Sequence, residues 1–194
     1  MIAIIDYNSG NIASIQNALA CLGVDSFVSA DPGEIIKADK IIFPGVGRAG
    51  VAMKELRKRG LDKFIPTITK PFLGICLGLQ LLAEFSEEDN MSCLGIIPGR
   101  VLKFPSSLKV PQIGWNQVAL QSLLPLTKNI PNNSYFYFVN SYYLEYLPKF
   151  TIGETNYGVP FSAVIQKNNF YATQFHPEKS GAIGQQILKN FCEL

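Results

Sequence analysis

The sequence predicts an α/β fold in which a mostly parallel sheet is covered by helices on both faces. Over residues 1–85, short apolar runs alternate with amphipathic helical patterns. Strands that are apolar on both faces are typical of parallel sheets buried between helices. After about residue 95, short aromatic and β-branched runs separated by turn residues take over. This change predicts added antiparallel strands in the C-terminal half.

The first half reads as strands and helices in alternation. Residues 1–6 form a continuous apolar run, which predicts a buried strand. A turn at residues 8–10 leads into a helix that Gly23 ends. One face of this helix carries Ile12, Ile15, Leu19 and Leu22. Further strands are expected at residues 27–29, 40–43 and 71–75, with a helix over about residues 50–59 between the last two.

The strand at residues 71–75 runs through Cys76 into a helix whose apolar positions are Leu77, Leu81, Leu82 and Phe85. In the second half, apolar runs predict strands at residues 101–104, 135–139, 161–165 and 170–173. The chain closes with a helix on which Ile183, Ile187, Leu188 and Phe191 share one face.

Length and composition limit the kinds of protein that this chain can be. At 194 residues, the chain is expected to be one domain over residues 1–194. A net charge of +2 gives no argument for nucleic acid or a membrane surface. Four cysteines without close spacing and a single histidine offer no zinc pattern and fit a reduced cytoplasmic protein. We therefore expect neither a metal nor another cofactor.

Gly74-x-Cys76-x-Gly78 has the form of a nucleophile elbow, a sharp strand-to-helix turn that exposes one side chain. A helix N-terminus favours thiolate over thiol. It also leaves backbone N–H groups free, such as that of Leu77, to receive a developing oxyanion. The competing interpretation is a buried core cysteine.

His176-Pro177-Glu178 supplies a base and a carboxylate. Proline disfavours helix for the residue before it, so His176 is expected to be extended. Residues i and i+2 of an extended segment face the same way, and Glu178 would then hold the imidazole in one tautomer. Alone, this segment also fits a surface His-Pro turn, but its occurrence with the elbow favours a Cys-His-Glu triad.

The loop at residues 44–47 follows a strand at the same edge of the sheet. Its two glycines allow unusual backbone angles. The peptide between Val46 and Gly47 is therefore a candidate second oxyanion donor, switched by a conformational change. A plain connecting loop is the alternative.

Taken together, these segments resemble the class I, triad-type glutamine amidotransferases, nearly from end to end. The matching segments lie at residues 6–11, 44–47, 74–82, 114–116, 137–142 and 174–181. Within that family, the first, fourth and fifth segments resemble the glutaminase subunits that supply ammonia to a (βα)₈-barrel cyclase in histidine biosynthesis. The resemblance implies a flavodoxin-like fold and a heterodimer with that barrel.

The resemblance also implies roles for single residues. Cys76 would attack the side-chain amide of glutamine, and His176 would protonate the leaving ammonia. Gln80 lies one helical turn beyond Cys76 and could bind the substrate. Ser141 and Tyr142 match positions that hold the amino-acid end of glutamine. Asn11 and Trp115 match partner-interface positions, with a helix N-cap and a core aromatic as the alternatives.

Two positions depart from the family pattern, Gln112 and Asn140, where histidine is common. Both are expected near the partner-facing or substrate-facing surface. They leave open a paralogue that feeds ammonia to a related barrel synthase in surface-sugar biosynthesis. A non-catalytic scaffold that keeps the fold is an alternative of another class, and a cysteine peptidase of similar fold is a third.

Overall fold

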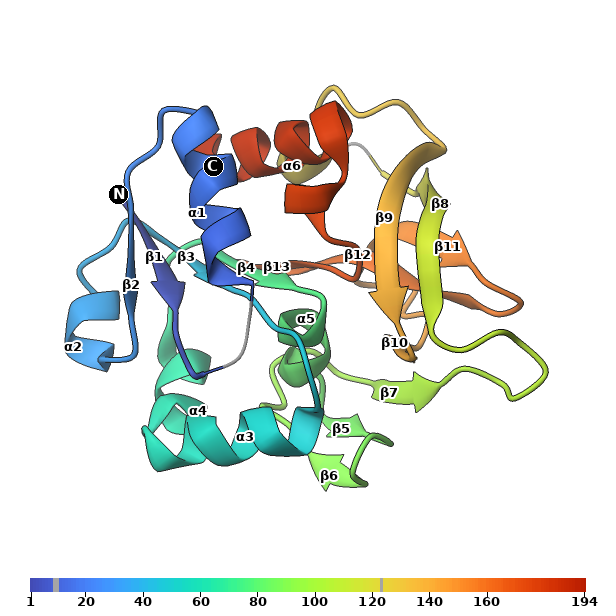
Figure 1. Cartoon of the computed structure of the whole chain (residues 1–194), viewed down its shortest axis with the longest axis horizontal. Coiled ribbons are helices and arrows are strands. Elements are labelled where there is room, and N and C mark those ends of the chain that lie inside the picture. Colours follow the sequence, from blue (N-terminus) through green and yellow to red (C-terminus); the bar gives the residue numbers. More distant parts are fainter. Residues whose placement is uncertain (9–10, 123) are drawn as a thin grey trace.

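The computed structural model describes residues 1–8, 11–122 and 124–194. Residues 9 and 10 of the predicted turn lie outside this part of the chain. Figure 1 shows a central sheet with helices on both sides of it. The predicted α/β fold, parallel in its first half with antiparallel strands added in the second, is confirmed.

Strands and helices alternate in the N-terminal half. In chain order they are β1 (Ile2–Ile5), α1 (Ile12–Cys21), β2 (Ser26–Ser29), α2 (Pro32–Ile35), β3 (Lys40–Phe43), α3 (Ala49–Lys58), α4 (Leu61–Phe64), a 3-10 helix (Ile65–Thr67), β4 (Phe72–Ile75) and α5 (Leu77–Leu82). Most predicted elements of this half therefore exist, with ends shifted by one or two residues. The short helices α2 and α4 were not expected.

The C-terminal half is mainly strand. It contains β5 (Phe85–Ser86), β6 (Met91–Ser92), β7 (Arg100–Lys103), β8 (Gln112–Leu120), a 3-10 helix (Pro125–Thr127), β9 (Ser134–Asn140), β10 (Tyr142–Leu144), β11 (Thr151–Asn156), β12 (Pro160–Lys167), β13 (Phe170–Thr173), a 3-10 helix (Pro177–Lys179) and α6 (Gly181–Glu193).

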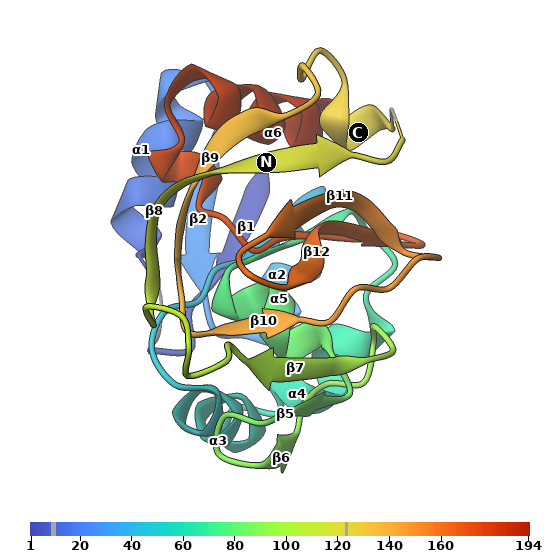
Figure 2. The same ribbon diagram turned by 90° about the vertical axis from the view of Figure 1, so that its right-hand side faces the viewer.

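The main sheet has nine strands in the order β2-β1-β3-β4-β13-β12-β11-β8-β9. The strands from β2 to β13 are parallel, and those from β13 to β9 pair antiparallel. A smaller sheet has the order β10-β7-β5-β6. Figure 2 shows β8 and β9 side by side as long strands, with the smaller sheet below them.

Two apolar cores lie on opposite faces of the parallel strands, because alternate residues of a strand point to opposite sides. Ala3 and Ile5 of β1 belong to one cluster, together with residues of α3 and α5. Ile2 and Ile4 belong to the other, together with residues of α1 and α6. The continuous apolar runs of the sequence follow from this burial on both sides.

The helix predicted from residue 77 to Phe85 is shorter than expected. It ends at Leu82, and Phe85 lies in β5. The carbonyls of Leu81 and Leu82 accept hydrogen bonds from the N–H groups of Leu94 and Ile96, both at 2.9 Å. These bonds satisfy the C-terminal carbonyls that a longer helix would have used internally.

One strand prediction also needs correction, and several strands were not expected. The segment at residues 170–173 was expected to be antiparallel, but β13 pairs parallel with β4 on one side and antiparallel with β12 on the other. The strands β5, β6, β8, β10 and β11 were not predicted. In β8, Gly114 has a φ of 136°, and such a glycine interrupts the β-branched pattern that signals a strand.

The topology places the functional candidates at one edge. The carboxyl ends of parallel strands meet along the same side of a sheet, where α/β proteins bind ligands. β3 leads there into the loop at residues 44–47, β4 leads into Cys76, and β13 leads toward His176. In the described part of the chain, no helix has both the length and the apolar character needed to cross a membrane.

Candidate active site

Cys76 occupies a strained turn between β4 and α5. Its φ of 55° and ψ of −108° lie outside the regions that residues other than glycine ordinarily adopt. Such a conformation costs on the order of 1–3 kcal/mol and persists only when its surroundings fix it. Here the Cys76 N–H donates to the Thr173 carbonyl at 2.8 Å, and the Cys76 carbonyl accepts from the Gln80 N–H at 3.2 Å. Hydrogen bonds of both the N–H and the carbonyl of Cys76 therefore fix the backbone of the elbow.

Two glycines allow β3 and α5 to approach each other at this turn. A Cβ atom at Gly78 would lie 2.0 Å from the Phe43 carbonyl oxygen. A Cβ atom at Gly45 would lie 2.7 Å from three atoms, the Gly78 N, the Leu77 Cβ and the Tyr7 hydroxyl oxygen. Because neither position has room for a side chain, the loop at residues 44–47 packs directly against the elbow.

The histidine and the glutamate form a buried pair. His176 Nδ1 and Glu178 Oε1 are 2.8 Å apart, and their side chains are only 2% and 1% exposed. His176 is extended, as predicted, with φ −95° and ψ 98°. Glu178, however, lies in a 3-10 helix and not in a continued strand. The turn begins at Pro177, which cannot donate to a strand ladder, and it still brings the carboxylate back to the imidazole.

Ser180 fixes the backbone that carries His176. Its hydroxyl donates to the His176 carbonyl at 2.7 Å and accepts from the Tyr137 N–H at 3.0 Å. The His176 N–H donates in turn to the Tyr137 carbonyl at 3.0 Å. These bonds tie the histidine segment to β9, so the imidazole has a defined position beside the elbow.

The thiol lies in a polar setting. The Gln174 Nε2 donates to Cys76 Sγ at 3.7 Å, and Sγ lies 3.9 Å from the Val139 carbonyl oxygen. His176 Nε2 is buried and has no hydrogen-bond partner among the described residues. Since Nδ1 contacts the glutamate, Nε2 is the ring atom left to exchange a proton with a substrate.

Burial alone would lower the pKa of His176. Its electrostatic interaction with Cys76 and the adjacent Glu178 carboxylate outweigh burial and raise the pKa from 6.5 to about 10. A raised histidine pKa means that protonation favours the folded state. This stabilising contribution is complete below pH 6.5 and is lost as the pH rises through about 10. At neutral pH the imidazole of His176 is therefore protonated.

We expect the His176 ring resonances in NMR spectra to show no titration between about pH 6 and 8, the range in which an ordinary histidine titrates. The signals are unambiguous because the chain has one histidine. In Cys76→Ala the interaction of His176 with Cys76 is absent, so the titration midpoint is expected to fall. A midpoint near 6.5 in the unaltered protein would contradict a raised pKa of His176.

A cavity of about 440 Å³ opens at the elbow. Eight predicted site residues line it, namely Val46, Gly47, Cys76, Leu77, Gln80, Ser141, Tyr142 and His176. Glu178 lies behind the imidazole. The structure thus gathers the predicted triad, oxyanion and substrate residues around one cavity, whereas Asn11 and Trp115 lie outside its lining.

Gln80 has an internal role besides lining the cavity. The side chain is 5% exposed. Its Nε2 donates to the Tyr142 carbonyl at 2.9 Å and to the Gln174 Oε1 at 3.1 Å. Both amide hydrogens are thereby used to hold β10 and the segment before His176. Only the carboxamide oxygen is left for a substrate.

Sequence reasoning missed two charged residues of the cavity, Glu88 and Lys179. The Glu88 carboxylate accepts from the Ala49 N–H at 2.8 Å. Burial is the main cause that raises the pKa of Glu88, and the neighbouring Asp89 acts in the same direction. No motif surrounds Glu88, so no local pattern marked it. Lys179 directly follows Glu178 and could have been found from that neighbourhood.

The outer face of β8 and β9 carries exposed apolar side chains. Trp115 is 56% exposed, Ile113 63% and Tyr135 54%. Trp115 pairs across the ladder with Tyr137, and their rings meet edge to face at 6.1 Å. Trp115 is therefore not a core aromatic. Asn11 is the N-cap residue of α1, although its side chain makes no capping hydrogen bond.

Gln112 and Asn140 were expected near the partner-facing or substrate-facing surface, and Asn140 lines the catalytic cavity while Gln112 lines a hollow beside Trp115. The Gln112 and Asn140 side chains are 3% and 5% exposed. The two positions that depart from the family pattern are also cross-strand partners, since Gln112 opposes Asn140 in the β8–β9 ladder. Residues at such positions share one face of the sheet, which the separate motifs of the sequence did not reveal.

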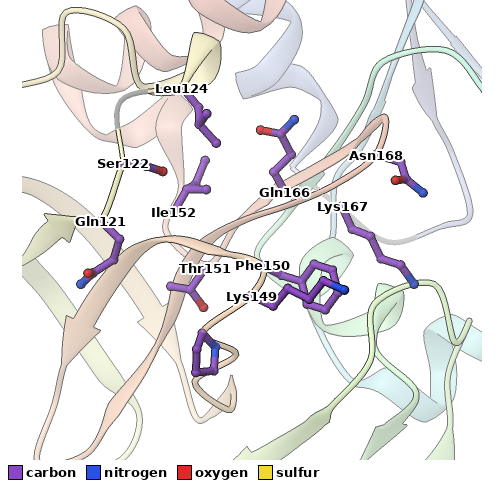
Figure 3. A pocket seen from close by; sticks show the side chains of 11 residues that line it. Gln121, Ser122, Leu124, Lys149, Phe150, Thr151, Ile152, Gln166, Lys167 and Asn168 are labelled. Carbon is purple, nitrogen blue, oxygen red and sulfur yellow. The ribbon is translucent and has the colours of Figure 1, made fainter.

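A further hollow of about 490 Å³ lies on another part of the molecule, lined by residues of β11 and β12 and by Gln121, Ser122 and Leu124. Figure 3 shows Lys149 beside Phe150 there, with the Lys149 amine 5.6 Å from the ring centre. Lys167 bonds the Ile96 carbonyl at 2.6 Å. None of the residues singled out from the sequence lines this hollow.

Comparisons with known proteins agree with this geometry. The family model "Glutamine amidotransferase class-I" matches residues 3–194. Among solved structures, a glutamine amidotransferase has a TM-score of 0.78 at 16% identity, covering 100% of this chain and 98% of its own. PurLQS from Thermotoga maritima has a TM-score of 0.75 at 15% identity, covering 99% and 97%. At these identities the likeness shows the fold.

Sequence relatives are closer. A Bacteroides fragilis protein named imidazole glycerol phosphate synthase subunit HisH is 49% identical to this chain, and the match covers 100% of this chain and 99% of that protein. The subunit HisH 1 of Methanococcus maripaludis is 48% identical over 100% of both chains, and that of Yersinia pseudotuberculosis is 45% identical over 100% and 99%. The chain therefore belongs to the class I glutamine amidotransferases, in the branch formed by the HisH subunits of imidazole glycerol phosphate synthase.

Proposed function

We propose that this protein hydrolyses glutamine to glutamate and passes the ammonia to a (βα)₈-barrel cyclase subunit in histidine biosynthesis. The two subunits form imidazole glycerol phosphate synthase, and the product and an aminoimidazole carboxamide ribonucleotide arise on the barrel. One observation carries the proposal: Cys76 on its strained elbow and His176, paired with Glu178, line one cavity.

The chemistry follows from the positions of these groups. The Cys76 sulfur attacks the side-chain amide carbon of glutamine, and the carbonyl oxygen becomes an oxyanion. The Leu77 N–H, at the first position of α5, has no acceptor within its own helix and can donate to this oxygen. The imidazolium of His176 gives its proton to the leaving nitrogen, and a glutamyl thioester and ammonia result.

Hydrolysis of the thioester completes the cycle. Neutral His176 takes a proton from water, which attacks the thioester carbon and releases glutamate and the thiolate. Glu178 keeps the proton-bearing Nδ1 oriented throughout, through its 2.8 Å contact. Ser141 and Tyr142 line the cavity with Glu88. The Glu88 carboxylate is the group in this lining that matches the α-ammonium of glutamine.

The loop at residues 44–47 is the proposed second oxyanion donor. Gly47 has a φ of 98°, a conformation that leaves room for its peptide to turn. Val46 is 41% exposed at the cavity. A partner that covers the cavity mouth would contact Val46 and could set the orientation of the Val46–Gly47 peptide. The isolated subunit is therefore expected to be weakly active.

The exposed apolar face of β8 and β9 is the proposed partner surface. Val139 lines the cavity and lies opposite Ile113 in the ladder, so this face is continuous with the cavity mouth. Exposed large apolar side chains on neighbouring positions mark interaction sites more often than single ones do. Trp115 has the size and aromatic character that interface anchors commonly show. Asn11 remains a second proposed interface residue.

The proposal is tested by measuring glutamine hydrolysis by this subunit alone and with the barrel subunit from the same organism plus its nucleotide ligand. We expect stimulation of at least about tenfold, which corresponds to ~1.4 kcal/mol of transition-state stabilisation. Fast hydrolysis by the isolated subunit would contradict the gated loop. No stimulation, with Cys76 still alkylated by a glutamine-like electrophile, would favour the paralogous surface-sugar synthase; no labelling would favour a scaffold.

The same assay tests the partner surface. Trp115→Ala is expected to raise the concentration of barrel needed for half-maximal stimulation, because an aromatic anchor at an interface is worth about 2 kcal/mol or more. Ile36→Ala is the control, since Ile36 is 43% exposed at the end of α2, which lies across the molecule from β8 and β9 (Figure 1). Equal effects of the two substitutions would place the interface elsewhere.

A further inference from the structure

Gln112 and Asn140 form the rung at one end of the β8–β9 ladder. Gln112 is the first residue of β8 and Asn140 the last of β9, and they lie directly opposite each other. Both are buried, on the face of the ladder opposite to the exposed Ile113 and Trp115. Two carboxamides therefore meet inside the protein beside the catalytic cavity.

Each carboxamide has an unused acceptor. Gln112 Oε1 and Asn140 Oδ1 are buried and accept no hydrogen bond from any residue that the structure describes. The Asn140 Nδ2 is engaged, since it donates to the Tyr142 carbonyl at 3.0 Å. Buried polar oxygens in native proteins almost always have a donor. Two unsatisfied oxygens on one rung indicate a site for a molecule that donates hydrogen bonds.

The rung lies between two hollows. Asn140 lines the catalytic cavity together with Cys76 and His176. Gln112 lines a separate hollow of about 340 Å³, whose other residues include Ile113 and Trp115 on the partner surface. A small molecule that passes from the first hollow to the second would meet the Asn140 oxygen first and the Gln112 oxygen next.

Ammonia fits this position by its chemistry. It carries three N–H donors on one small atom, and it is released at His176 in the cavity that Asn140 lines. Carboxamide oxygens accept hydrogen bonds but carry no charge, so they can hold ammonia without the strong ion pair that a carboxylate would form with ammonium. Ammonia that is bound by these neutral oxygens can therefore move on and is not held in place.

We propose that Gln112 and Asn140 form a transit site that accepts hydrogen bonds from ammonia between the catalytic cavity and the partner surface. This inference rests on the proposed glutaminase function. Gln112 and Asn140, the two positions that depart from the family pattern, would then have a role in ammonia transfer.

The test measures coupling in the complex with the barrel subunit, as moles of cyclase product formed per mole of glutamate released. Gln112→Leu, which removes the acceptor oxygen, is expected to lower this ratio several-fold, because ammonia then escapes to solvent. Product formation from added ammonium salt by the same variant complex should stay near that of the unaltered complex. Gln112→His, whose neutral ring nitrogen can accept, is expected to restore the ratio.

Gln121→Leu is the matched control, because Gln121 is exposed just beyond β8 and lines neither of the two hollows. An unchanged ratio in Gln112→Leu would overturn the transit site and leave the rung a structural pair. Equal losses in Gln112→Leu and Gln121→Leu would overturn it too. If Gln112→Leu does not assemble with the partner, the same ratio is measured for Gln112→Met, and the same results support or overturn the transit site. Absence of glutamine hydrolysis in the unaltered complex would instead count against the proposed function itself.

Discussion

Replacing Cys76 with alanine is expected to abolish glutamine-dependent synthesis while the complex keeps its ammonium-dependent synthesis. The thiol is the proposed nucleophile, and removal of the nucleophile from a catalytic triad costs on the order of 10⁶-fold in turnover. The barrel would still take up free ammonia, because that reaction bypasses the elbow. Glutamate release and cyclase product, each measured with glutamine and with an ammonium salt, give the comparison.

Cys93→Ala is the control for loss of a thiol. Burial raises the pKa of Cys93 to about 11, so this thiol is protonated at neutral pH and a poor nucleophile. Both reactions should therefore survive in Cys93→Ala. If Cys76→Ala loses ammonium-dependent synthesis as well, the two reactions are not separable, and Cys76 would have a structural role in the complex.

The geometry of the candidate triad was predictable from the sequence because its signals are local. A glycine two positions on either side of Cys76 marks a strained strand-to-helix turn, and the structure has that turn with a φ of 55°. Pro177 follows His176 and fixes its extended backbone. The residues of each segment predict the local backbone conformation of that segment. The parallel sheet then brings the segments to one edge because its strands share a direction.

Contacts between segments that are distant in the chain could not be predicted from the sequence in this way. Glu88 reaches the cavity because its carboxylate caps the N–H of Ala49, a contact between loops that no periodicity encodes. The pairing of Gln112 with Asn140 depends on the register of β8 and β9. The sequence did not predict β8, since Gly114 and a series of amides replace the β-branched residues of a typical strand.

The elbow and the loop at residues 44–47 depend on each other through one close contact. The Phe43 carbonyl lies where a side chain at Gly78 would begin. Phe43 ends β3 immediately before the loop, and Gly78 follows Leu77 in the first turn of α5. Both proposed oxyanion donors therefore flank this contact, and a change there affects both together.

Gly78→Ala is accordingly expected to remove most glutaminase activity and to destabilise the fold. The new Cβ would lie 2.0 Å from the Phe43 carbonyl oxygen, a backbone atom that cannot move aside as a flexible side chain would. Overpacking of this kind costs about 1–3 kcal/mol or more of unfolding free energy. Chemical denaturation and glutamine hydrolysis in the complex, measured on the same preparation, separate the two effects.

Gly33→Ala is the matched control for that substitution. A Cβ at Gly33 would meet only the Asp31 side chain, at 3.3 Å from Oδ1, and the site is remote from the cavity lining. Its stability should change by a few tenths of a kcal/mol to about 1 kcal/mol, with activity kept. In Gly78→Ala, separation of β3 from α5 shifts the Leu77 N–H and the Val46–Gly47 peptide, so hydrolysis should fall further than the loss of folded protein explains. Activity that falls only in proportion to the folded fraction would show that the oxyanion donors do not depend on this contact.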